Sequence, residues 1–185
     1  MPFIKRFFSK TNIILYVITL GIIALDLITK HIAQSNLGVG ESTTFISGLI
    51  DFTYTLNKGA AWSAFASLQN SALILGIISC IFAIGVFAFN LYLKTDKNLL
   101  YYFAFCLVLG GTLGNGFDRL FLGAVRDFIQ CTFISFPIFN VADMCLVVGL
   151  CLFCLWYFIR VFKNDKDKKQ NEQQNQIVKE DEDKE

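Results

Sequence analysis

The sequence predicts an all-α membrane protein with four transmembrane helices and a small extramembrane β-sheet at one end. Hydrophobic residue types make up 55% of the 185 residues and charged types only 17%, below the quarter that is usual for soluble domains. Residues 163–185 hold 14 of the 31 charged side chains, so the rest of the chain is more apolar still. Four stretches there are long and apolar enough to cross a bilayer as helices.

The four predicted spans belong to one membrane domain, residues 1–162. They cover residues of about 12–30, 71–93, 98–117 and 139–162. The remainder, residues 163–185, mixes both charge signs and contains no aromatic residue. Such a segment buries too little apolar surface to fold alone, so we expect a charged, disordered tail.

Basic residues near the spans predict the orientation, because cytoplasmic loops carry an excess of Lys and Arg. Basic clusters precede the first span, separate the second from the third, and follow the fourth. Four spans place all three clusters on one side, so both termini are expected in the cytoplasm. The clusters are Lys5, Arg6 and Lys10; Lys94 and Lys97; and Arg160, Lys163, Lys166, Lys168 and Lys169.

The connection between the first two spans contains a strand pattern. Residues 41–56 are rich in Thr, Ile, Phe and Tyr, and Ser47 and Gly48 interrupt them. Such residues flanking a turn signal are typical of a β-hairpin. We expect this hairpin on the outer side of the membrane, beside the end of the first span.

Several classes of function are excluded by what the chain lacks. No basic face exists, which excludes a nucleic-acid-binding module. The only histidine is His31, and no HExxH or GxSxG motif occurs, which argues against zinc peptidases and serine triads. Five of the six cysteines fall in predicted spans, where Cys acts as a small hydrophobe. We therefore expect no metal and no cofactor.

Four carboxylates gather at the outer membrane surface, although they lie far apart in the sequence. They are Asp26, Asp118, Asp127 and Asp143, out of only seven acids before residue 163. Ionisable groups at membrane depth are costly and mark functional or pairing sites. The cluster is therefore the candidate functional site.

Some of these polar residues have a structural alternative. Asp26 can pair with Lys30 one helical turn later, in the favourable acid-to-Lys order. Asp118 and Arg119 can form a charge pair at the membrane interface. Asn57 can cap the backbone where a loop meets the membrane.

Asp127 and Asp143 have no such partner at helical spacing on their apolar sides. Two neighbouring carboxylates cannot both ionise cheaply, so one retains a proton while the other acts as a base. Such a pair can activate water and protonate a leaving amine. This is the chemistry of an aspartyl peptidase.

Two other functions compete with a peptidase. Intramembrane carboxylates also serve as proton relays in transporters and channels. A relay needs polar groups at several depths, and the cytoplasmic halves of the predicted spans carry no charge apart from Arg160 at the end of the fourth. A structural assembly subunit is the other alternative. It leaves Asp127 and Asp143 unexplained.

Five motifs resemble those of bacterial lipoprotein signal peptidases, the signal peptidase II family. They occur in the same order and on the same four-span topology. The motifs are DLITK (26–30), NKGAAWS (57–63), GGTLGNGFDR (110–119), VRDFI (125–129) and FNVAD (139–143).

The resemblance implies a four-helix aspartyl endopeptidase of the bacterial inner membrane, with a β-cradle and its active site on the periplasmic side. Its substrates would be diacylglyceryl-modified prolipoproteins, cleaved just before the lipidated Cys, and its other partner is membrane lipid. We expect a monomer. The resemblance assigns catalysis to Asp127 and Asp143, substrate binding to Asn57, Asn115, Arg119 and Asn140, and supporting roles to Asp26, Lys30, Gly59 and Asp118.

Arg126 departs from the family pattern, which usually has an apolar residue before this aspartate. The departure leaves two expectations open. The positive charge of Arg126 either lowers the pKa of Asp127 or points away from the site.

Overall fold

A computed structural model describes residues 3–59, 70–93 and 98–182, without the side chains of residues 169, 171 and 173–182. Within this part of the chain, four helices are long and apolar enough to cross a membrane, which confirms the predicted fold class. The helices are α1 (Phe3–Phe7), α2 (Lys10–Asn36), α3 (Ser71–Tyr92), α4 (Leu99–Phe121) and α5 (Val141–Glu182). Residues 60–63 of the NKGAAWS motif, Lys94, Lys97 and residues 183–185 of the tail lie outside the described residues.

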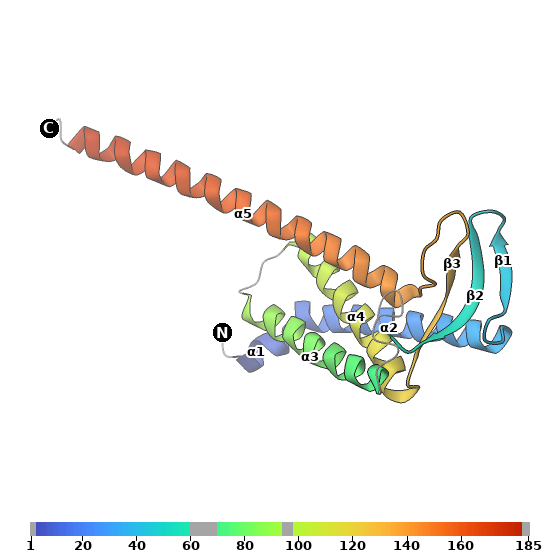
Figure 1. The fold of residues 1–185 in the computed structure, drawn as a ribbon. Helices are drawn as coiled ribbons and strands as arrows, with labels where there is room; N and C mark the ends of the chain where they lie inside the picture. Colours follow the sequence, from blue (N-terminus) through green and yellow to red (C-terminus); the bar gives the residue numbers. More distant parts are fainter. Residues whose placement is uncertain (1–2, 60–69, 94–97, 183–185) are drawn as a thin grey trace.

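Helix α4 is the centre of the bundle. In its most apolar window 67% of the residues are buried, against 28% or less in the other three long helices. The other three pack around α4 (Figure 1). Their remaining apolar surface faces outward, as expected of helices solvated by lipid. A cluster of buried residues fills the half of the bundle away from the sheet: Leu15, Ala83, Tyr101, Phe105, Cys106, Leu109 and Trp156.

Glycines on α4 allow its neighbours to approach closely, as the GGTLGNG spacing predicts. A Cβ on Gly110 would lie 2.6 Å from Ile22 of α2. A Cβ on Gly111 would collide with the backbone oxygen of Ala142 in α5. A Cβ on Gly114 would lie 2.5 Å from a carboxylate oxygen of Asp26. Small residues at these contacts let the helix backbones touch, which brings the polar ends of α2, α4 and α5 together.

We expect Gly111→Ala to destabilise the protein by about 1–3 kcal/mol, since the added methyl group overpacks the contact between α4 and α5. Gly21→Ala is the matched control, because a Cβ on Gly21 meets nothing within 4 Å. That change should stabilise α2 by up to about 1 kcal/mol. Thermal unfolding in detergent measures both, and equal melting temperatures for the two variants would contradict the close contact.

A three-stranded antiparallel sheet covers one end of the bundle (Figure 1). Its strands are β1 (Ser42–Ile46), β2 (Ile50–Asn57) and β3 (Val125–Cys131), in the order β1-β2-β3. The hairpin of β1 and β2 confirms the strand pattern, and Gly48 in its turn has φ +75°, which favours glycine. Strand β3 does not follow from the strand patterns in the sequence.

Strand β3 brings the second half of the chain to the hairpin. Thr55 pairs with Asp127, and Asn57 pairs with Val125. A small apolar cluster of Ala33, Tyr54 and Phe128 fastens the sheet to the end of α2. The sheet thus holds Asn57 and Asp127 at the polar end of the bundle.

Helix α5 continues beyond the bundle to Glu182 (Figure 1). The structure therefore differs from the expected disorder of residues 163–185 as far as it is described. The physical reason is composition, because Lys, Glu and Gln are good helix formers. The described side chains of this extension, at residues 163–168, 170 and 172, are exposed, so helix propensity rather than packing accounts for these residues being helical.

Candidate active site

The two predicted catalytic carboxylates line one cavity where the sheet meets the bundle. Asp127 is the third residue of β3, and Asp143 is the third residue of α5. The cavity has a volume of about 540 Å³ and is also lined by Asn57 and Arg119. Asp127 is buried, with only 2% of its surface exposed. Most of the other lining residues are apolar and belong to segments 136–139 and 144–148.

One asparagine connects the two carboxylates. The Nδ2 of Asn140 donates to Oδ1 of Asp127 at 2.6 Å, and the backbone N–H of Asn140 donates to Oδ2 of Asp143 at 3.1 Å. The Oδ1 of Asn140 accepts the backbone N–H of Asp143 at 3.0 Å, as a side chain does at a helix N-terminus. The start of α5 therefore fixes Asp143 relative to Asp127.

A second asparagine holds Asp143 from the side of α4. The Nδ2 of Asn115 donates to Oδ1 of Asp143 at 2.7 Å. The Oδ1 of Asn115 accepts from Asn140 at 3.0 Å and from the Nζ of Lys30 at 2.9 Å. With two donors on its oxygen, the amide of Asn115 has one orientation, which presents its N–H to Asp143.

Asn57 contacts Asp127 on the side away from Asn140. Its Nδ2 donates to Oδ2 of Asp127 at 3.2 Å, and its Oδ1 accepts the backbone N–H of Gly59 at 2.9 Å. Arg119 donates to the carbonyl oxygen of Gly59 at 3.2 Å. Within the described residues, the buried Nε of Arg119 has no hydrogen-bond partner, so one donor of this side chain is left for a ligand in the cavity.

The pKa of Asp127 is raised to about 7. Burial is the largest cause, because it disfavours the charged carboxylate, and the negative charge of Asp143 adds to it. Hydrogen bonds from Asn57 and Asn140 and the charge of Lys30 act in the opposite direction. Near neutral pH, Asp127 can therefore hold a proton beside Asp143.

A layer of ion pairs lies behind the carboxylates. The Nζ of Lys30 lies 2.8 Å from Asp26 and 3.4 Å from Asp118, and all three side chains are buried. The predicted pairing of Asp26 with Lys30 is confirmed. Asp26 also accepts the backbone N–H of Ala142 at 2.9 Å, so this pair anchors the first turn of α5 next to Asp143.

Arg126 points away from the cavity, which settles the question left open by the sequence. Its guanidinium donates to both oxygens of Asp118, at 2.7 and 3.2 Å, and to Gln34 at 3.1 Å. Neighbouring residues on a strand face opposite sides, so Arg126 and Asp127 separate. Among the described residues Asp118 pairs with Lys30 and Arg126, so the alternative of an Asp118–Arg119 pair is wrong.

Neither the contact of Gln34 nor the role of Arg126 as the partner of Asp118 was predicted from the sequence. The only signal in VRDFIQC was its content of Val, Phe and Ile, which favour strands, because its apolar and polar residues do not alternate. No pattern in the sequence connects Gln34 to a residue 92 positions away.

Comparisons with known proteins agree with this arrangement. Residues 18–159 match the family model for signal peptidase (SPase) II. The lipoprotein signal peptidase of Lactobacillus johnsonii is 38% identical over 160 residues, which are 86% of this chain and 99% of the relative. That of Latilactobacillus sakei is 41% identical over 143 residues, 76% of this chain and 91% of the relative.

Two solved structures of bacterial membrane enzymes, determined by the in meso method, have the same fold. One, at 2.3 Å resolution, is 30% identical with a TM-score of 0.72 and covers 80% of this chain and 88% of its own. The other, at 1.9 Å, is 31% identical with a TM-score of 0.69 and covers 77% and 91%. The matched range contains the whole carboxylate site, and the chain belongs to the signal peptidase II family.

Proposed function

We propose that this protein removes the signal peptide from diacylglyceryl-modified prolipoproteins by cleaving just before the lipidated Cys, with Asp127 and Asp143 as the catalytic dyad. Family membership makes the chain a multi-pass membrane hydrolase of the aspartic signal peptidase II type, which acts on lipoprotein signal peptides. The observation that carries the dyad is the pair of hydrogen bonds through which Asn140 holds both carboxylates.

In the proposed reaction the dyad begins with one proton. Asp127 carries it, because the pKa of this carboxyl is raised to about 7, and Asp143 is the base. Asp143 takes a proton from water, the water oxygen attacks the scissile carbonyl carbon, and Asp127 protonates the carbonyl oxygen. The proton on Asp143 then passes to the leaving nitrogen of the Cys, and one hydroxyl of the diol returns a proton to Asp127 as the C–N bond breaks. This leaves Asp127 protonated and Asp143 ionised, as at the start, and the pair titrates as one unit.

The cavity supplies groups for positioning the peptide. Arg119 and Asn57 line it beside the dyad, and a charged or amide donor there can hold a peptide carbonyl. We assign substrate binding to these two residues and to Asn115 and Asn140, which hold the carboxylates. Each buried CH₂ of the substrate's acyl chains contributes about 0.8 kcal/mol to membrane binding. The chains therefore stay in lipid and confine the scissile bond to the depth of the site.

The orientation in the membrane is part of the proposal. Helix α1 and the α5 extension lie at the end of the bundle opposite the sheet (Figure 1). The basic residues near α1 and after the bundle favour the cytoplasm for that end. The sheet and the dyad then face the periplasmic or outer side of a bacterial inner (cytoplasmic) membrane. We propose that the protein works there as a monomer.

The direct test of the function is cleavage by the purified protein in proteoliposomes. A prolipoprotein with a diacylglyceryl-modified Cys should yield a product that begins with that Cys. The same prolipoprotein without the lipid should be cleaved far more slowly. Equal rates on both substrates, or cleavage at another bond, would contradict the proposed specificity.

Activity should fall as the pH rises through about 7, because Asp127 then loses the proton that the dyad needs. Asn57→Ala removes a hydrogen bond that lowers the pKa of Asp127. The pKa rises further in this variant, so we expect the alkaline limb of the kcat profile to move upward by a fraction of a pH unit.

Asn36→Ala is the control for this shift, since Asn36 is exposed on α2 and bonds only its own helix among the described contacts. Its pH profile should match that of the unmodified protein. An alkaline limb that stays in place or moves downward in Asn57→Ala would show that Asp127 is not the group that holds the proton.

A further inference from the structure

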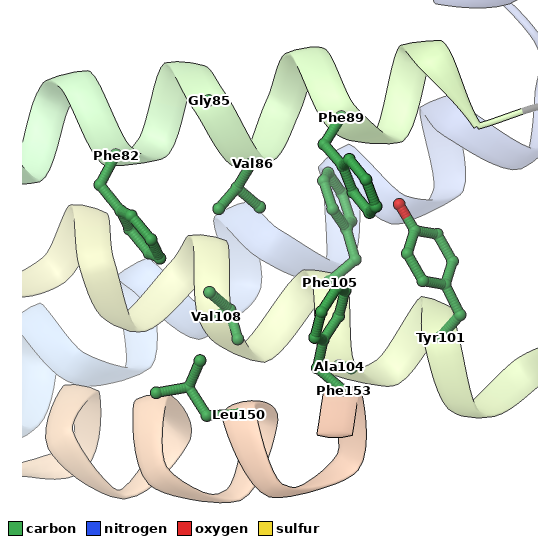
Figure 2. Close-up of a pocket in the computed structure, with 10 residues that line it drawn as sticks. All are labelled: Phe82, Gly85, Val86, Phe89, Tyr101, Ala104, Phe105, Val108, Leu150 and Phe153. Atoms are coloured by element: carbon green, nitrogen blue, oxygen red, sulfur yellow. The ribbon is translucent and has the colours of Figure 1, made fainter. Parts of the chain in front are cut away.

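Another cavity lies along the half of the bundle away from the sheet and the dyad. It has a volume of about 390 Å³ and lies where α3 and α5 flank the central helix α4. Figure 2 shows Phe82 and Val86 of α3 facing Leu150 of α5 across this space. We call this cavity the apolar groove.

The groove opens to the surroundings of the bundle and offers no polar partner of its own. Phe82 and Leu150, on its two sides, are 47% and 46% exposed. Among the lining residues that the structure describes, Tyr101 alone has a polar side chain, and its hydroxyl donates to Asn90 at 3.2 Å. A ligand here must be apolar, because any buried polar group would lose its hydrogen bonds to water.

The groove continues the active-site cavity along one face of α5. Asp143 and Val147 line the active-site cavity, and Leu150 and Phe153 line the groove. Spacings of three and four residues place all of them on the same side of a helix. Asp143 and Phe153 are ten residues apart, which corresponds to about 15 Å along the helix axis.

Aromatic side chains close the far end of the groove. The rings of Phe89 and Phe153 meet edge to face with centroids 6.0 Å apart. Phe153 also contacts the ring of Tyr101 at 6.5 Å. A helical ligand that begins at the dyad can therefore contact the protein over about ten residues before it reaches these aromatic side chains.

We infer that the groove binds the apolar segment of the signal peptide, which precedes the scissile bond. The inference rests on the proposed function and extends it to the part of the substrate remote from the dyad. Signal peptides contain an apolar run of about 7–15 residues before the cleavage site. The length of this run as a helix matches the length of α5 from Asp143 to Phe153. The groove then aligns the substrate so that its cleavage site reaches the dyad.

Gly85 offers a way to fill the groove without disturbing the fold. It lines the groove on α3, and a Cβ built on it meets nothing within 4 Å. Gly85→Leu therefore adds an isobutyl group at the wall of the groove, at a position where Cβ itself has open space. Gly21→Leu is the matched control, since Gly21 on α2 has the same open space and lies outside the groove.

The test compares two lipidated substrates in proteoliposomes. One is a full prolipoprotein, and the other is a diacylglyceryl-Cys peptide that keeps a few residues before the Cys but lacks the apolar run. We expect Gly85→Leu to raise KM for the full substrate about tenfold with little change in kcat, as loss of remote binding does. Gly85→Ala should have a smaller effect in the same direction. The short substrate should be cleaved at the unmodified rate by all variants, and Gly21→Leu should leave both substrates unchanged.

The outcomes separate the two proposals. If Gly85→Leu cleaves the full substrate as well as the unmodified protein does, the groove holds lipid or nothing, and the inference is overturned. A similar loss on both substrates also overturns it, because the change then acts on the dyad. Failure of the unmodified protein to cleave either substrate contradicts the proposed function, and the inference falls with it.

Discussion

Asp127→Asn and Asp143→Asn should each lower kcat on a diacylglyceryl-modified prolipoprotein by on the order of 10³-fold. An amide can neither accept the proton of water nor supply the proton that the carbonyl oxygen needs. Both variants keep the shape of the side chain, so the hydrogen bonds around Asn140 can reorganise without unfolding the site. Initial rates of product formation in proteoliposomes measure the effect.

Asp51→Asn is the matched control for these two variants. Asp51 belongs to the same sheet, on β2, where it pairs in register with Gln130 rather than lining the cavity. Replacing Asp51 should change the cleavage rate by less than about twofold, as expected of a substitution away from the core and the cavity. A tenth or more of the activity remaining in Asp127→Asn or Asp143→Asn would refute the catalytic assignment.

Asp118→Asn should have the largest effect on stability, about 3–5 kcal/mol. Asp118 is 1% exposed and pairs with both Lys30 and Arg126. Among the described residues, removing its charge leaves Arg126 without an ion-pair partner and Lys30 with Asp26 alone. Since Arg126 lies on β3, we expect this strand to loosen first. Denaturant unfolding in detergent measures the loss, and hydrogen exchange at β3 locates it.

Asp127→Asn provides the contrast. A buried acid with a raised pKa costs stability once it ionises, and this cost appears as the pH rises from the unfolded-state pKa near 4 towards about 7. Asp127→Asn should remove that cost and be as stable as the unmodified protein, or more so, above pH 7. If Asp118→Asn unfolds like the unmodified protein, its ion pairs do not stabilise the fold.

The features that could be predicted from the sequence depend on local patterns. Apolar runs of about 20 residues indicate spanning helices wherever they occur, and the hairpin of β1 and β2 is a contiguous segment with a glycine in its turn. The ion pair of Asp26 and Lys30 joins two residues that are one helical turn apart. In each case the sequence neighbours are also the spatial neighbours.

The geometry of the site depends on contacts that no local pattern encodes. Arg126 reaches Gln34 across 92 residues, and Lys30 reaches Asn115 across 85. Strand β3 is seven residues long and becomes a strand by pairing with β2. The resemblance to signal peptidase II pointed to residues that the structure brings together, but not to the way in which Asn140 joins the two carboxylates.

The single-turnover cleavage rate of Asp127→Asn/Asp143→Asn, set against each single variant, tests the central claim most directly. If the two carboxylates share one proton and one water, either substitution disables the pair, and the double variant should be no slower than the slower single variant. If the double variant is instead slower by the product of the two single effects, the carboxylates act independently, and the dyad is contradicted.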